Sequence, residues 1–79
     1  MIEKIKDLYP EKDFLIADGF NDAIIGFEYK EKRIIYSVTK CLEILNKDMS
    51  KKDAEEYFDY NIAGAYLGDK TPIWCYDNF

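Results

Sequence analysis

The N-terminal segment carries apolar residues at helical spacing. Ile2, Ile5 and Leu8 recur every three residues, which places them on one face of a short helix. Pro10 ends this helix, because its ring forces the preceding residue out of helical geometry. A helix of this length is not stable alone, so the pattern predicts that it docks on the rest of the chain.

Three short apolar runs follow, each bounded by turn residues. They span residues 14–18, 23–29 and 33–38 and are rich in β-branched and aromatic side chains, which favour strands. Gly26 lies inside the second run and indicates a β-bulge or a close backbone contact. Because the connecting loops are short, we expect the three strands to form an antiparallel meander.

Residues 39–68 predict two further helices. Thr39 can cap a helix through residues 41–47. Ser50 and Asp53 resemble a capping box at the start of the longest helix. The apolar face of this longest helix is predicted to contain Ala54, Tyr57, Phe58, Ile62, Ala65 and Tyr66.

Two residues of the longest helix depart from helical preference. Asn61 falls on the apolar face, so we expect its buried amide to bond a neighbouring backbone turn. Gly64 costs about 1 kcal/mol relative to alanine in a helix, which indicates the close approach of another element. Gly68 predicts the end of the helix, and residues 71–76 predict a fourth short strand with Pro72 at its start or at a sheet edge.

The elements follow the order α-β-β-β-α-α-β within a single domain, residues 1–79. The expected fold class is α+β, with a small antiparallel sheet of three or four strands and three helices packed on one face. The chain has 79 residues, of which 48% are hydrophobic. This balance is typical of a folded domain with a small core.

Composition excludes several classes of function. The chain has 16 acidic and 11 basic residues, a formal charge of −5 and no histidine. The lack of histidine removes the commonest general base and metal ligand. Neither a nucleophile elbow nor a phosphate-binding glycine motif is present, and the missing basic stripe argues against direct nucleic-acid binding. We therefore expect a non-enzymatic protein, with no catalytic residue, no metal site and no cofactor.

The cysteines and the hydropathy pattern bear on location. Cys41 and Cys75 are too few for the disulfide framework of a small secreted protein and lack the partners of a usual zinc site. We expect two reduced, buried thiols. The first 13 residues lack the apolar core of a signal peptide, and no apolar run has the length of a membrane span. These features predict a cytosolic protein without membrane contact.

The first candidate binding site is the loop that contains Asp18, Phe20, Asn21 and Asp22. Its carboxylates and amide are suitable ligands for a hard cation or a small molecule, although the spacing of an EF-hand is absent. The same residues also suit a turn, in which Asp18 and Asn21 bond nearby backbone N–H groups. Phe20 either folds back into the core or serves as a contact anchor.

The second candidate site is the acidic part of the longest helix, with Glu55, Glu56 and Asp59. No base interrupts residues 53–69. One interpretation is a carboxylate surface that imitates nucleic-acid phosphates and occupies a partner's basic groove. The other is the solvated face of an amphipathic helix.

Aromatic residues make up 16% of the chain, more than a small core can hold. Exposed tyrosine and tryptophan are frequent hot spots of protein interfaces. We expect partial exposure of Tyr29, Tyr60, Trp74, Tyr76 and Phe79. These side chains favour contact with a protein, including self-association into a homo-oligomer.

Three segments taken together resemble a known family. They are ADGFNDAIIG at residues 17–26, KCLEIL at 40–45, and EEYFDYNIAGAYLG at 55–68 running into TPI at 71–73. The pattern ADGF-x-x-AIIG … EYF-x-x-N-x-x-GAY-x-G-x-x-TP is similar to that of small tailed-bacteriophage and prophage proteins of unassigned activity, in which Asp or Glu is common at the position of Asn21. The resemblance implies a viral origin and a location in the host cytoplasm, and it supplies no catalytic residues.

The leading hypothesis is a non-enzymatic, small acidic phage protein that binds a host or phage protein. By analogy with other small phage proteins, it would inhibit a host-defence or nuclease complex. One alternative is a small-ligand or metal-binding module at residues 18–22. Another is a self-associating structural or assembly protein of the phage.

Overall fold

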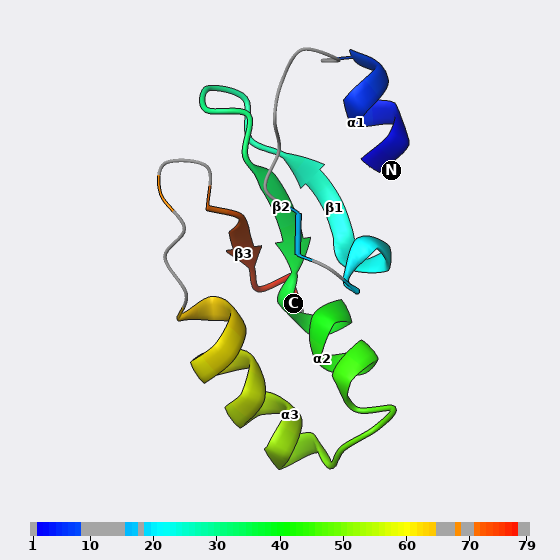
Figure 1. Ribbon diagram of the computed structural model, residues 1–79, viewed down its shortest axis with the longest axis vertical. Helices are drawn as coiled ribbons and strands as arrows, with labels where there is room; N and C mark the ends of the chain where they lie inside the picture. Colours follow the sequence, from blue (N-terminus) through cyan, green and yellow to red (C-terminus); the bar gives the residue numbers. More distant parts are fainter. Residues whose placement is uncertain (1, 9–15, 18, 65–67, 69–70, 78–79) are drawn as a thin grey trace.

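The computed structural model describes residues 2–8, 16–17, 19–64, 68 and 71–77 (Figure 1). In this part of the chain, three α-helices and three strands form an α+β fold, which confirms the expected fold class. The elements are α1 (Ile2–Leu8), β1 (Ile24–Phe27), β2 (Ile34–Ser37), α2 (Val38–Leu45), α3 (Lys51–Tyr57) and β3 (Ile73–Cys75). A 3-10 turn, η1 (Asn21–Ala23), precedes β1, and a π-helical segment, η2 (Phe58–Ala63), continues α3.

The sheet has the strand order β1-β2-β3 and is mixed. β1 and β2 pair antiparallel, as expected, and their register shifts between Ile24 and Gly26. This shift confirms the β-bulge indicated by Gly26. Of the predicted first strand, residues 14–15 and 18 lie outside the described residues, and Ile16 and Ala17 are not in a strand.

The expectation of an entirely antiparallel sheet is wrong for β3. β2 and β3 run parallel, with Ile35 opposite Ile73 and Ser37 opposite Cys75. The physical reason is the connection between them, because β2 continues directly into α2 and the chain returns through α3. A long helical crossover brings the next strand back in the same direction. In Figure 1, α2 and α3 form a hairpin beyond the end of the sheet at which β2 and β3 terminate.

The core joins the sheet to both arms of the helical hairpin, α2 and the η2 segment that continues α3. Its buried members are Ile5, Phe20, Ala23, Ile24, Ile34, Tyr36, Cys41 and Phe58. The ring of Trp74 packs against it, 5.1 Å from the Tyr36 ring and 5.4 Å edge-on from the Phe58 ring. Aromatic pairs at these distances add to the stability from buried area. They therefore tie β2, β3 and η2 together.

Burial also sets the chemistry of two core side chains. Desolvation raises the pKa of the Tyr36 hydroxyl, and it raises the pKa of the Cys41 thiol to about 11. Tyr36 Oη accepts a hydrogen bond of 2.7 Å from the backbone N–H of Ala17. Both cysteines are free thiols, with Cys41 buried and Cys75 partly buried. The expected burial is therefore complete only at Cys41.

Helix capping follows the sequence at one helix and departs from it at the other. Ser50 caps α3 as predicted, because its hydroxyl accepts from the backbone N–H of Asp53 at 3.2 Å. The cap of α2 is Ser37 and not Thr39, since its hydroxyl accepts from the Lys40 N–H at 3.1 Å. Ser37 ends β2 in extended geometry, so the helix begins immediately after the strand.

Ser37 makes a second hydrogen bond, which has no counterpart at Ser50 among the described residues. Its side chain is buried, and its hydroxyl donates to Asp77 Oδ1 at 2.7 Å. One oxygen therefore caps α2 and holds the segment that follows β3. This segment includes Tyr76, which lies beside the helical hairpin.

We predict that Ser37→Ala lowers the free energy of unfolding by about 2.5 kcal/mol, the sum of a lost cap of about 1 kcal/mol and a lost charge-assisted bond of about 1.5 kcal/mol. Ser50→Ala is the matched control, because it removes a cap alone and is expected to cost about 1 kcal/mol. Urea unfolding of both variants measures the difference. Equal losses would show that the bond to Asp77 contributes nothing to stability.

Candidate functional site

The loop before β1 is a folded turn. Asp18 lies outside the described residues. Phe20 is only 9% exposed and belongs to the core, so of its two possible roles the structure shows packing and not an exposed anchor. Its backbone closes the turn by donating to Ala17 O at 3.1 Å and accepting from the Ala23 N–H at 2.9 Å. Asn21 and Asp22 are the exposed side chains of this candidate site.

The structure divides the acidic residues of the longest helix between two surfaces. Glu55 and Asp59 lie one turn apart on the side that faces α2 and β3, where both line a cavity. Glu56 is exposed and is absent from the lining of this cavity. The three carboxylates of the second candidate site therefore do not act as one set. All three side chains are exposed, but only Glu55 and Asp59 line the cavity.

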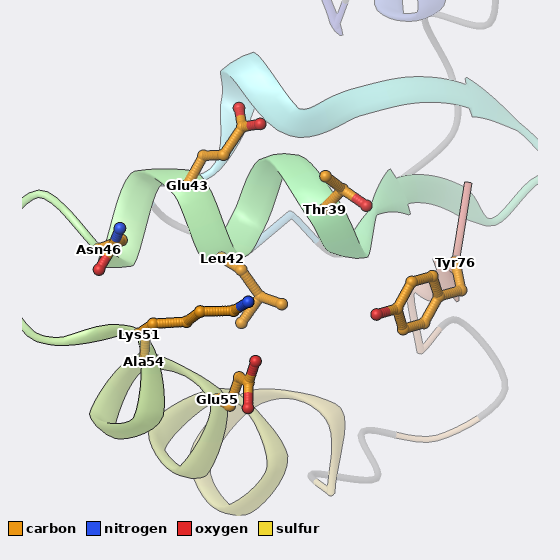
Figure 2. A pocket seen from close by; sticks show the side chains of 8 residues that line it. All are labelled: Thr39, Leu42, Glu43, Asn46, Lys51, Ala54, Glu55 and Tyr76. Atoms are coloured by element: carbon orange, nitrogen blue, oxygen red, sulfur yellow. The ribbon is translucent and has the colours of Figure 1, made fainter. Parts of the chain in front are cut away.

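Two adjoining hollows make up this concave site. The smaller hollow has a volume of about 260 Å³ and opens between α2 and α3 (Figure 2). The larger has a volume of about 440 Å³ and extends towards β3. Leu42, Glu55 and Tyr76 line both hollows, so we describe them together as the helix groove.

The helix groove combines an apolar wall with charged side chains. Leu42 and Phe58 contribute the apolar surface, together with Trp74 from β3. In Figure 2, the side chains of Glu55 and Lys51 point into the space between the helices, and Tyr76 lies at the far end. Concave sites of this size with a few polar groups are typical ligand and peptide sites.

Trp74 of β3 and Tyr76, which follows the strand, complete the groove. Tyr76 is 61% exposed and is held there by the neighbouring bond between Asp77 and Ser37. Trp74 Nε1 is buried, and no acceptor for it exists among the described residues. A buried donor without an acceptor costs about 1–3 kcal/mol.

Every fourth residue along α3 and η2 packs towards the core. The core face follows Ala54, Phe58 and Ile62 at intervals of four. Tyr57, predicted on this face, is 45% exposed and lies outside this row. Asn61 is also exposed, contrary to expectation, although its Nδ2 does donate to a backbone carbonyl, that of Tyr57, at 3.3 Å.

Gly64 closes the wide π-helical turn of η2. Its N–H donates to Asp59 O at 3.1 Å, and a Cβ at this position would lie 2.9 Å from the same oxygen. The approach of another element, predicted from the sequence, is therefore wrong for the described residues, because the atoms that crowd Gly64 belong to the helix's own backbone. Asp59 lies on the groove side, one turn after Glu55.

The shifted pKa values have structural causes outside the groove. The backbone N–H groups of Glu31 and Lys30 bond the Glu28 carboxylate and lower its pKa. The pKa values of Tyr36 and Cys41 are raised by burial of these side chains in the core. Each shift therefore reflects turn or core structure and does not mark a catalytic acid or base.

Exposed aromatic side chains are found both at the groove and away from it. Tyr60 is 84% exposed on η2, and Tyr76 borders the groove, as the sequence predicted for both. Tyr29 is exposed at the distant turn, Trp74 is partly buried, and Phe79 lies outside the described residues. The sequence did not identify Leu42 as a groove residue. The only available signal was its apolar character, which it shares with core residues.

Comparison with protein-family models, curated proteins and solved structures found no match. Within the described residues, no helix has both the length and the apolar character needed to cross a membrane. No group of three or more His, Cys, Asp or Glu side chains in the same residues is arranged to hold a metal ion. The interpretation of the helix groove therefore rests on its geometry.

We predict that Gly64→Ala lowers the free energy of unfolding by about 1 kcal/mol, because the added Cβ crowds Asp59 O. Gly26→Ala is the control, since no atom lies within 4 Å of a Cβ there. We expect that variant to stay within about 0.5 kcal/mol of the original. Thermal and urea unfolding check both. Helix propensity alone predicts that Gly64→Ala stabilises by about 1 kcal/mol, and that result would contradict the tight turn.

Proposed function

We propose that this protein is a non-enzymatic binding module that captures another protein through the helix groove. The observation that carries the proposal is the convergence of apolar and acidic side chains from three elements. Leu42 of α2, Glu55 of α3 and Trp74 of β3 line one continuous hollow. Protein-binding sites characteristically place apolar and aromatic anchors at the centre and polar groups at the rim.

Three nucleophilic side chains of the described residues, Ser37, Cys41 and Ser50, are engaged or protonated, which supports binding over catalysis. The Ser37 hydroxyl donates to Asp77 and accepts from the Lys40 N–H. The Cys41 thiol has a pKa of about 11, so it is protonated at neutral pH. The Ser50 hydroxyl oxygen caps α3.

The class of partner follows from the charge of the groove and from the resemblance to phage proteins. Glu55 and Asp59 favour a partner with a basic surface, because opposite charges speed association and align the complex. Nuclease complexes that bind nucleic acid present such surfaces. A host-defence or nuclease complex in the host cytoplasm is therefore the partner that we propose, with inhibition as the consequence of occupying its basic site.

Exposed tyrosines also permit self-association as a second function. Tyr57 and Tyr60 are 45% and 84% exposed on α3 and η2. A pair of copies in contact through this face would cover both rings. Sedimentation over a range of concentrations distinguishes the two functions. Self-association requires a dimer, whereas capture of another protein does not.

We predict that Glu55→Lys combined with Asp59→Lys abolishes partner capture, because the repulsion acts inside the groove. Capture is measured by affinity purification from infected-host lysate, with mass spectrometry to identify and quantify the partner. Asp48→Lys with Glu56→Lys is the matched control, since both residues are exposed, neither lines the groove, and the net charge changes equally.

The control variant should retain most of the capture, and both variants should keep the circular dichroism spectrum of the original protein. Equal loss in the two variants would show that the general acidic field, and not the groove, holds the partner. Unchanged capture in the groove variant would contradict the proposed function.

A further inference from the structure

We infer that the helix groove takes an arginine side chain that is flanked by apolar residues on the partner protein. This inference rests on the proposed function and specifies the chemistry of the partner. Among the described residues that line the larger hollow, Glu55 and Asp59 carry charge and none is basic. Its other lining groups are apolar or aromatic, so a cation with an apolar stem fits both features.

The spacing of the two carboxylates favours arginine over lysine. Residues four apart on a helix have neighbouring side chains, with their Cβ atoms about 6 Å apart. Glu55 and Asp59 have this spacing and line the same hollow. A guanidinium group has five N–H donors in one plane and can bond two carboxylates at once, whereas an ammonium group is a point charge.

The aromatic residues at the end of β3 provide a second contact for the same group. Trp74 and Tyr76 line the hollow that contains the carboxylates, and Tyr76 is largely exposed. A guanidinium group stacks on aromatic rings through cation–π attraction, which strengthens when water is excluded. The rings would thus contact the face of the guanidinium group, and the carboxylates would bond the N–H groups at its edge.

The apolar wall determines what flanks the arginine. Val38, Leu42 and Ala63 line the larger hollow, which at about 440 Å³ has the size of a typical ligand pocket. They suit the methylene stem of arginine and one or two neighbouring apolar side chains. Lys51 lines the smaller hollow together with Glu43.

The probe is a synthetic peptide with one arginine between two leucines, acetylated and amidated so that its termini are uncharged. Trp74 is the only tryptophan in the chain and lines the groove. Its fluorescence and the NMR resonance of its indole N–H therefore report occupancy directly. A matched peptide contains citrulline, which has the shape of arginine without its charge, and a third contains lysine.

We predict saturable binding of the arginine peptide, about tenfold weaker binding of the citrulline peptide, and intermediate binding of the lysine peptide. Glu55→Gln with Asp59→Asn should weaken binding of the arginine peptide about tenfold, because charge-assisted bonds are lost. Glu56→Gln is the control, because Glu56 is exposed and lines neither hollow; it should change the affinity by less than about twofold.

The results separate this inference from the proposed function. No response of Trp74 to the arginine peptide, or equal affinity for the citrulline peptide, would overturn the assignment of arginine. Equal weakening by Glu56→Gln would also overturn it. If lysate capture still depends on Glu55 and Asp59 in that case, the groove remains the contact and only its ligand is wrong. If capture is independent of both residues, the proposed function fails as well.

Discussion

The buried hydroxyl of Ser37 is the constraint on which the arrangement of the helix groove depends. It lies where β2 becomes α2, and it bonds both the first turn of the helix and the carboxylate of Asp77. Because β3 pairs with β2 up to Ser37 and Cys75, the same region fixes the strand and the segment beyond it. Tyr76 is thereby placed opposite the helical hairpin, where it completes one end of the groove.

The second constraint is the wide turn that continues α3. A regular α-helix advances about 100° per residue, whereas a π-helical turn holds more residues and changes the direction of those that follow. Phe58 and Ile62 remain directed at the core, and Glu55 and Asp59 remain on the groove side. Such π-helical turns are frequent at functional sites, which agrees with the position of η2 beside the groove.

Local rules in the sequence predicted features that depend on neighbouring residues alone. The cap at Ser50 and the bulge at Gly26 belong to this group. The parallel direction of β3 did not follow from local patterns, because it depends on how the crossover packs. Helical spacing also admitted Tyr57 to the apolar face, whereas the buried row contains Ala54 and Phe58. The groove was only half predicted: Glu55 and Asp59 were identified, but their separation from Glu56 and their approach to Trp74 arise from tertiary packing.

The central claim is that partner binding takes place at the helix groove and not at the loop before β1. Hydrogen–deuterium exchange of the protein, alone and with its captured partner, tests this claim directly. The account predicts slower exchange in residues 51–64 and 74–77 of the complex, with residues 19–23 unchanged. Slower exchange confined to residues 19–23 would contradict it.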